Sequence, residues 1–129
     1  MNSIYYDLYG STSDDIERKR LALERAFSVE AEARESSYVG CYYTYKLQNG
    51  EELRLTLNYQ PWIDDEEDRW IDERFKSYAM LLYVTSSQPM EFERIIRSSM
   101  SDFVILERVR FDTVNGVKTE HEMINKSKS

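Results

Sequence analysis

The chain has 129 residues, of which 41% are hydrophobic and 13% aromatic, with only four glycines and two prolines. This composition is typical of one packed domain and excludes a disordered chain. The formal net charge of −7 disfavours contact with nucleic-acid phosphates and with anionic lipid surfaces. No stretch is apolar for long enough to span a bilayer, and Asp7 interrupts the apolar run that a secretory signal needs. We therefore expect a cytoplasmic protein that binds neither nucleic acid nor membranes.

The first two predicted elements are a strand and a helix. Residues 3–10 alternate large side chains and end at a glycine, which indicates a strand. Residues 11–27 begin with Ser11 and Thr12, either of which could cap the first turn of a helix. The apolar positions of this helix, spaced seven and four residues apart, are Ile16, Leu23 and Phe27. The pattern predicts an amphipathic helix.

A β-hairpin is predicted around Asn49-Gly50, the dipeptide that most readily adopts a type I′ turn. After this turn a row of leucines alternates with polar residues, which predicts a strand with one buried and one wet face. The leucines are Leu53, Leu55 and Leu57, and the polar residues are Arg54, Thr56 and Asn58. We expect the leucine row to pack against Leu23 and Phe27 of the first helix.

The second half of the domain repeats the alternation of strand and helix. Residues 79–84 are apolar on both faces, as in a strand near the centre of a sheet. Residues 88–100 predict a second helix with Pro89 in its first turn, and residues 102–111 predict a long strand.

With one further strand between the first helix and this hairpin, the predicted order is β-α-β-β-β-β-α-β. It indicates an α+β fold with a mostly antiparallel sheet of about five to six strands and two helices packed on one face. We assign residues 1–111 to this single domain. The polar residues 112–129 form either a hairpin arm or a flexible tail.

Few residues in the chain could carry chemistry. Cys41 and His121 are the only cysteine and histidine, and each lies far in sequence from a plausible metal or catalytic partner. We expect Cys41 to be packed or half-packed within a strand. The chain has no glycine-rich phosphate loop and no serine beside an activating base. We therefore expect no catalytic residues, no metal and no cofactor.

The stretch PWIDDEEDRWIDERF, residues 61–75, carries most of the net charge. Between Asp64 and Glu73, seven carboxylates stand against the single Arg69, a local charge of −6 out of −7. The carboxylates are Asp64, Asp65, Glu66, Glu67, Asp68, Asp72 and Glu73. A calcium loop that began at Asp64 would need glycine at its sixth position and glutamate at its twelfth, but Arg69 and Phe75 stand there. The spacing argues against a metal site.

Trp62 and Trp70 lie among these carboxylates, and two interpretations remain open for them. Aromatic anchors surrounded by charge are typical of a protein interface, here one for a basic partner. Alternatively, both indoles fold inward and cap an edge of the sheet. Under the first interpretation the partner-binding residues are the two tryptophans and the seven carboxylates.

The chain resembles the immunity proteins of bacterial contact-dependent growth inhibition systems. The segments that carry the resemblance are YDLYGSTSDDIERKRLALERAF, ESSYVGCYY, LRLTLNY, RWIDERFKSYAMLLYV and FVILERVRF, between Tyr5 and Phe111. The resemblance implies an intracellular α+β protein that binds and neutralises a toxin domain, often a nuclease with a basic substrate groove. It assigns no contact residue to this chain. Two other function classes stay open: a small cytoplasmic adaptor, and an enzyme whose site the linear sequence does not reveal.

Overall fold

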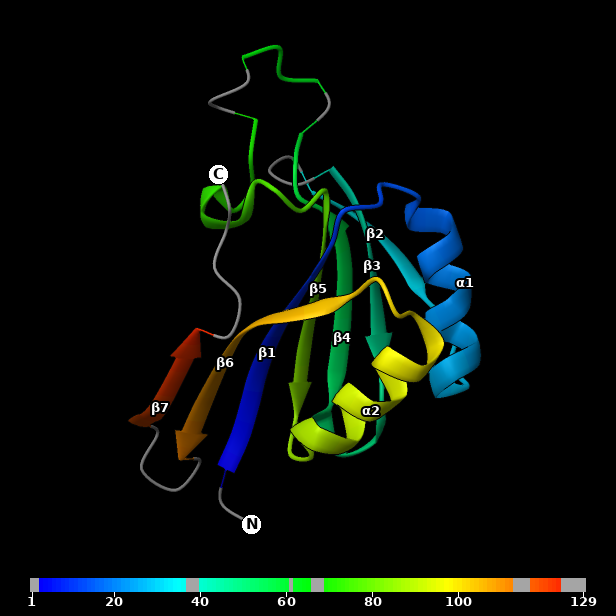
Figure 1. Ribbon diagram of the computed structural model, residues 1–129. Helices are drawn as coiled ribbons and strands as arrows, with labels where there is room; N and C mark the ends of the chain where they lie inside the picture. Colours follow the sequence, from blue (N-terminus) through cyan, green and yellow to red (C-terminus); the bar gives the residue numbers. More distant parts are fainter. Residues whose placement is uncertain (1–2, 37–39, 61, 66–68, 113–116, 124–129) are drawn as a thin grey trace.

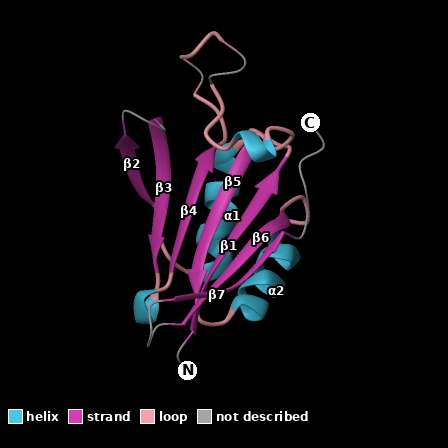
Figure 2. Ribbon diagram, turned by 90° about the vertical axis from the view of Figure 1, so that its left-hand side faces the viewer, coloured by secondary structure: helices cyan, strands magenta, loops and turns pink. Residues whose placement is uncertain are grey.

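The computed structural model describes residues 3–36, 40–60, 62–65, 69–112 and 117–123. These residues form a single antiparallel sheet of seven strands with both α-helices on one of its faces (Figures 1 and 2). The elements are β1 (Ser3–Ser11), α1 (Ile16–Phe27), β2 (Glu32–Ser36), β3 (Gly40–Lys46), the 3-10 turn η1 (Gln48–Gly50), β4 (Glu52–Leu57), the 3-10 turn η2 (Glu73–Phe75), β5 (Met80–Ser86), α2 (Pro89–Ser99), β6 (Val104–Asp112) and β7 (Val117–Met123).

The strands lie in the order β2-β3-β4-β5-β1-β6-β7, and every neighbouring pair is antiparallel. The predicted α+β class, the order of elements from β1 to β6 and the two helices on one face are confirmed. Strand β7 follows them and pairs with β6 at one edge of the sheet. It lies in the segment for which the sequence left an arm and a tail as alternatives.

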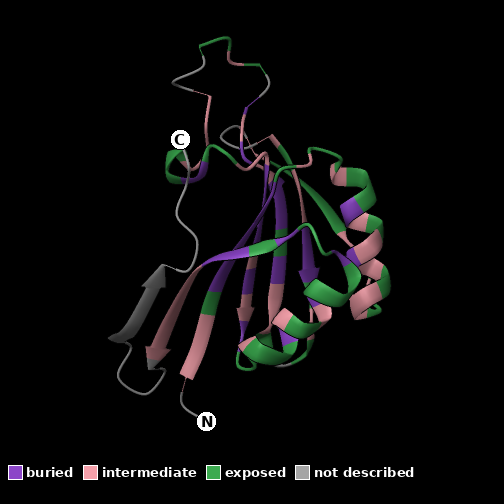
Figure 3. Ribbon diagram, viewed as in Figure 1, coloured by how far each residue is buried: buried purple, intermediate pink, exposed green. Residues whose placement is uncertain are grey.

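The main core lies between the sheet and the two helices. Leu53 and Leu55 of β4 are fully buried together with Leu23 of α1, and Phe27 packs against the same cluster. The predicted packing of Leu53 and Leu55 against the first helix is thus confirmed, whereas Leu57 is only half-buried. Strand β5 contributes buried side chains to both faces, as expected of a central strand, and Figure 3 shows the burial concentrated in the middle strands.

The first helix starts one turn later than predicted, and the cap at Ser11 or Thr12 is wrong. Ser11 is the last residue of β1, where it pairs with Met80 and its buried hydroxyl donates to Asp102 at 2.8 Å. The N-cap is Asp15, whose carboxylate accepts a hydrogen bond from the amide of Arg18 at 3.2 Å. Helix α2 begins with Pro89, as predicted.

The hairpin at Asn49-Gly50 is present, but its turn is not type I′. The amide of Leu47 donates to the carbonyl of Glu51 at 2.9 Å, so three residues close the loop, and they form η1. Gly50 has a φ of +76°. This is the three-residue hairpin, in which a helical turn is followed by one left-handed glycine, whereas type I′ needs two residues with positive φ.

The predicted wet face of β4 is wrong over its second half. Thr56 and Asn58 are only 2% and 0% exposed. The reason is a smaller core on the face opposite the helices, where Phe75 of η2 packs on Leu8, Leu81 and Leu106. The connection between β4 and β5 folds back over this end of the sheet. It covers Thr56 and Asn58, which the alternation of the sequence predicts to face solvent.

Candidate functional site

The acidic stretch forms a projection beyond one end of the sheet, between β4 and β5 (Figures 1 and 2). We call residues 60–71 the acidic projection; its described residues are 60, 62–65 and 69–71. Its base is a short antiparallel pair of segments. The amide of Gln60 donates to the carbonyl of Arg69 at 2.8 Å, and the amide of Ile71 donates to the carbonyl of Asn58 at 3.0 Å. Backbone pairing therefore fixes the two ends of the projection against each other.

Asn58 is the residue that joins this base to the sheet. Its side chain is fully buried, and its Nδ2 group donates to the carbonyls of Asp72, Phe75 and Tyr78 at 3.3, 3.0 and 3.1 Å. Its Oδ1 atom accepts from the amide of Asp72 at 2.8 Å. A single carboxamide thus satisfies four backbone groups of the returning chain, groups that would be costly to bury without partners.

The two tryptophans occupy different environments. Trp62 is 55% exposed and lies two residues beyond Gln60, at the base of the projection. One edge of its indole lies over Gly40 at the start of β3, where a Cβ atom would come within 2.8 Å of the ring. Gly40 has a φ of +77°, so both its backbone conformation and this close approach require glycine. Trp62 is therefore oriented by its contact with Gly40, at the end of the hairpin that β2 and β3 form, while most of its surface stays open to solvent.

Trp70 lies at the base of the acidic projection and is half-buried. It forms an isolated β-bridge with Tyr59, and the two rings meet edge to face with their centroids 6.1 Å apart. The guanidinium of Arg69 lies 5.6 Å from the centre of the indole. The two open interpretations thus separate: Trp62 faces outward, and Trp70 packs within the base.

The carboxylates divide in the same way. Asp64 and Asp65 are exposed beside Trp62, whereas Glu73 is exposed on η2. Asp72 is engaged locally, since it forms an ion pair with Arg74 at 2.8 Å, and Arg74 also binds Glu107 of β6 at 3.0 Å. Hydrogen bonds to these two carboxylates raise the pKa of Arg74. The predicted residues Glu66, Glu67 and Asp68 lie outside the described residues.

Other candidates for a site are weaker. Cys41 is exposed, not packed as predicted, because it lies near the end of β3; its thiol is 3.7 Å from Glu35 Oε2. Among the residues that the structure describes, no three histidine, cysteine or acidic side chains gather as metal ligands. Within the same residues, no helix has the length and apolar character needed to cross a membrane.

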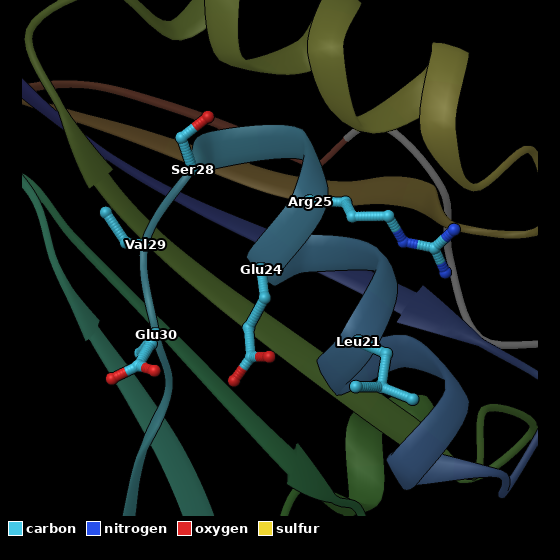
Figure 4. Close-up of a pocket in the computed structure, with 6 residues that line it drawn as sticks. All are labelled: Leu21, Glu24, Arg25, Ser28, Val29 and Glu30. Carbon is cyan, nitrogen blue, oxygen red and sulfur yellow. The ribbon is translucent and has the colours of Figure 1, made fainter.

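A hollow of about 490 Å³ lies at the C-terminal end of α1 (Figure 4). Its lining residues are Leu21, Glu24, Arg25, Ser28, Val29 and Glu30. Glu24 already accepts hydrogen bonds from the amide of Ala31 at 2.9 Å and from Arg20 at 3.1 Å, and Arg25 extends away from Glu24 and Glu30. Glu24 therefore holds the connection from α1 to β2, and the polar groups of this hollow do not converge on a ligand position.

Comparison with known proteins adds no family to these observations. A scan against protein-family models gave no match, and neither did a search of curated proteins.

The role of Asn58 can be tested by substitution. Asn58→Ala removes the acceptor of the Asp72 amide and the side-chain donor to three carbonyls, of which those of Asp72 and Phe75 also accept from the amides of Phe75 and Tyr78. We expect it to lower the free energy of unfolding by about 2–4 kcal/mol. Asn58→Asp keeps the shape but turns a carboxylate toward three carbonyls, and should cost at least as much at neutral pH. Urea unfolding measures both, with the exposed Gln48→Ala as the control. An Asn58→Asp variant as stable as the unmodified protein would contradict the role given to this side chain.

The two tryptophans provide a matched pair for a second test. Trp70→Ala removes half-buried packing against Tyr59 and should cost about 2 kcal/mol of stability. Trp62→Ala removes a largely exposed ring and should change stability by less than about 1 kcal/mol. Chemical denaturation of the two variants side by side checks the difference. The reverse order of stability losses would show that the indoles have been assigned to the wrong environments.

Proposed function

We propose that this protein is an immunity protein that binds and neutralises a cognate contact-dependent growth inhibition toxin domain. The toxin is a nuclease with a basic active-site groove, and the inhibitor acts by surface contact, not by catalysis. The contact is centred on the exposed residues of the acidic projection, Trp62, Asp64 and Asp65. The observation that carries the proposal is the outward position of these three side chains on a projection with an anchored base.

Anchoring favours tight binding by this surface. Association costs free energy when loops and side chains must be ordered at the interface, and a pre-formed contact surface reduces that cost. The base is held by Asn58 and by two backbone hydrogen bonds between its segments. Trp62 is in addition positioned by Gly40 of the neighbouring hairpin. A large aromatic side chain in such a position is the kind of residue that dominates interface energies.

Charge supports a basic partner. Ten residues of the stretch, from Asp64 to Glu73, hold a net charge of −6. Concentrated charge of one sign accelerates association with a surface of the opposite sign and repels like-charged competitors. A row of carboxylates can also occupy a groove that normally accepts phosphates. Asp72 forms an ion pair with Arg74 and is therefore better suited to holding η2 than to binding the toxin. We place the toxin contact at the exposed residues of the acidic projection instead.

The resemblance of five chain segments to immunity proteins favours a toxin over other basic partners. An adaptor that binds a protein of the same cell through this surface is the alternative. The two differ in the partner: an immunity protein is encoded beside a large secreted protein whose C-terminal domain is basic, and protects a cell that expresses this domain.

The test is co-expression with the C-terminal domain of such a neighbouring toxin. We expect the protein to restore growth and to co-purify with the toxin domain. Replacing Asp64 and Asp65 by lysine should slow association by about tenfold or more at low ionic strength and weaken its salt dependence. Stopped-flow mixing over a salt series measures both effects.

The control for that variant reverses two exposed acids elsewhere, with Asp14→Lys and Glu30→Lys. It changes the net charge by the same amount but leaves the acidic projection intact, so we expect a much smaller effect on the rate. Equal slowing by both double variants would mean that total charge matters and not this surface. Failure of the unmodified protein to protect or to bind would overturn the proposed function.

A further inference from the structure

The face of the sheet opposite the helices is only partly covered, and its uncovered part is aromatic. Phe75 of η2 covers one end of this face, whereas Tyr6 of β1 is 44% exposed toward the other end. The ring of Tyr6 meets Phe111 of β6 edge to face, with centroids 5.3 Å apart. Figure 2 shows this face without an α-helix over it. The acidic projection lies beyond the end of the strands, so this surface is separate from the candidate site above.

Arg54 lies in the middle of this face without an acidic neighbour across the strands. It is exposed on β4, opposite Tyr83 of β5 on one side and Thr44 of β3 on the other. Its guanidinium stacks over the ring of Tyr83 at 4.5 Å from the centroid. Cross-strand pairs more often place opposite charges together. Among the described residues, no carboxylate lies within 4 Å of this guanidinium in an ion pair.

A hollow of about 220 Å³ lies beside the Arg54 side chain. It is lined by Tyr6, Glu52, Arg54, Tyr83 and Thr85. Glu52 brings a negative charge, but it forms an ion pair with Lys46 at 3.6 Å. Glu107, the acid beside Leu8 on this face, is held by Arg74. Within the described part of the chain, Arg54 is thus the positive charge that lines the hollow, and no ion pair joins it to Glu52 or to another acid.

We propose that this hollow binds a small organic acid, a carboxylate on a flat apolar body. Arg54 also shares a side-chain hydrogen bond with Tyr83. A guanidinium has five N–H groups, and those that remain can match the two oxygens of a carboxylate. Thr85 also lines the hollow, and the rings of Tyr6 and Tyr83 supply apolar contact for the body of the ligand. The volume is small compared with typical ligand sites of about 300–1,000 Å³, so the ligand is about the size of one ring with its acid group.

A simpler interpretation gives Arg54 no ligand: its only role would be to cover the ring of Tyr83. The two interpretations differ in what a carboxylate does to the protein. If Arg54 only covers the ring, its removal lowers stability, and added acids produce no localised response. If the hollow is a site, an acid but not its neutral analogue produces a saturable response that depends on Arg54.

The experiment is a titration with benzoate, followed by amide chemical shifts of the ¹⁵N-labelled protein. Benzamide, which has the same ring but no charge, is the matched control. We expect saturable shifts at Tyr6, Arg54 and Thr85 with benzoate, half-complete at about 1 mM or lower, and no saturable shifts with benzamide. Arg54→Gln should weaken benzoate binding at least about tenfold, whereas Arg18→Gln, which removes one exposed positive charge on α1 at the other face of the sheet, should weaken it far less.

The proposal is overturned if benzoate and benzamide shift the same amides equally, if the shifts map to other parts of the surface, or if Arg54→Gln leaves the titration unchanged. A spectrum of Arg54→Gln that keeps the dispersion of the unmodified protein shows that the variant is folded. The hollow is separate from the proposed toxin-binding surface, and the titration uses the protein alone. Its result therefore does not depend on whether the protein binds a toxin.

Discussion

The buried carboxamide of Asn58 is the interaction on which the most distinctive part of this structure depends. It lies where β4 ends, and it binds three carbonyls and one amide of the chain that returns toward β5. Those contacts hold η2 over one end of the sheet, which lets Phe75 form a second small core with Leu8 and Leu81. The same contacts fix the base of the acidic projection. One polar side chain thus couples packing on the sheet to the presentation of an exposed tryptophan and its neighbouring acids.

The two faces of the sheet have different roles. Both helices and the leucine-rich core occupy one face and stabilise the fold. The other face is divided between the cover supplied by η2 and an open area around Tyr6, Arg54 and Tyr83. Together with the projection beyond the strand ends, this arrangement keeps the proposed binding surfaces apart from the main core, so they can change with little cost to stability.

Much of the fold could be predicted from local patterns, and the errors have a common origin. Period-two and helical spacing identified the two helices, β1, the hairpin of β3 and β4, β5 and β6, because most of these elements bury a regular row of side chains such as Leu53 and Leu55. The wet face assigned to Thr56 and Asn58 was wrong, because the chain that covers them returns from more than ten residues later. The cap at Ser11 failed for a similar reason, since its hydroxyl binds the distant Asp102. In the candidate site, composition identified the acidic stretch. It could not separate Trp62 from Trp70, because their burial is decided by Gly40 and Tyr59 in three dimensions.

The central claim is that a basic protein partner binds the exposed residues of the acidic projection. Hydrogen exchange of the protein, alone and in complex with the neighbouring toxin domain, tests it most directly. Our account predicts that complex formation slows exchange at the amides of residues 62–65 and at those of the adjacent base, with little change in α1 and α2. Protection confined to the helices or to the far edge of the sheet, with unchanged exchange in the projection, would contradict it.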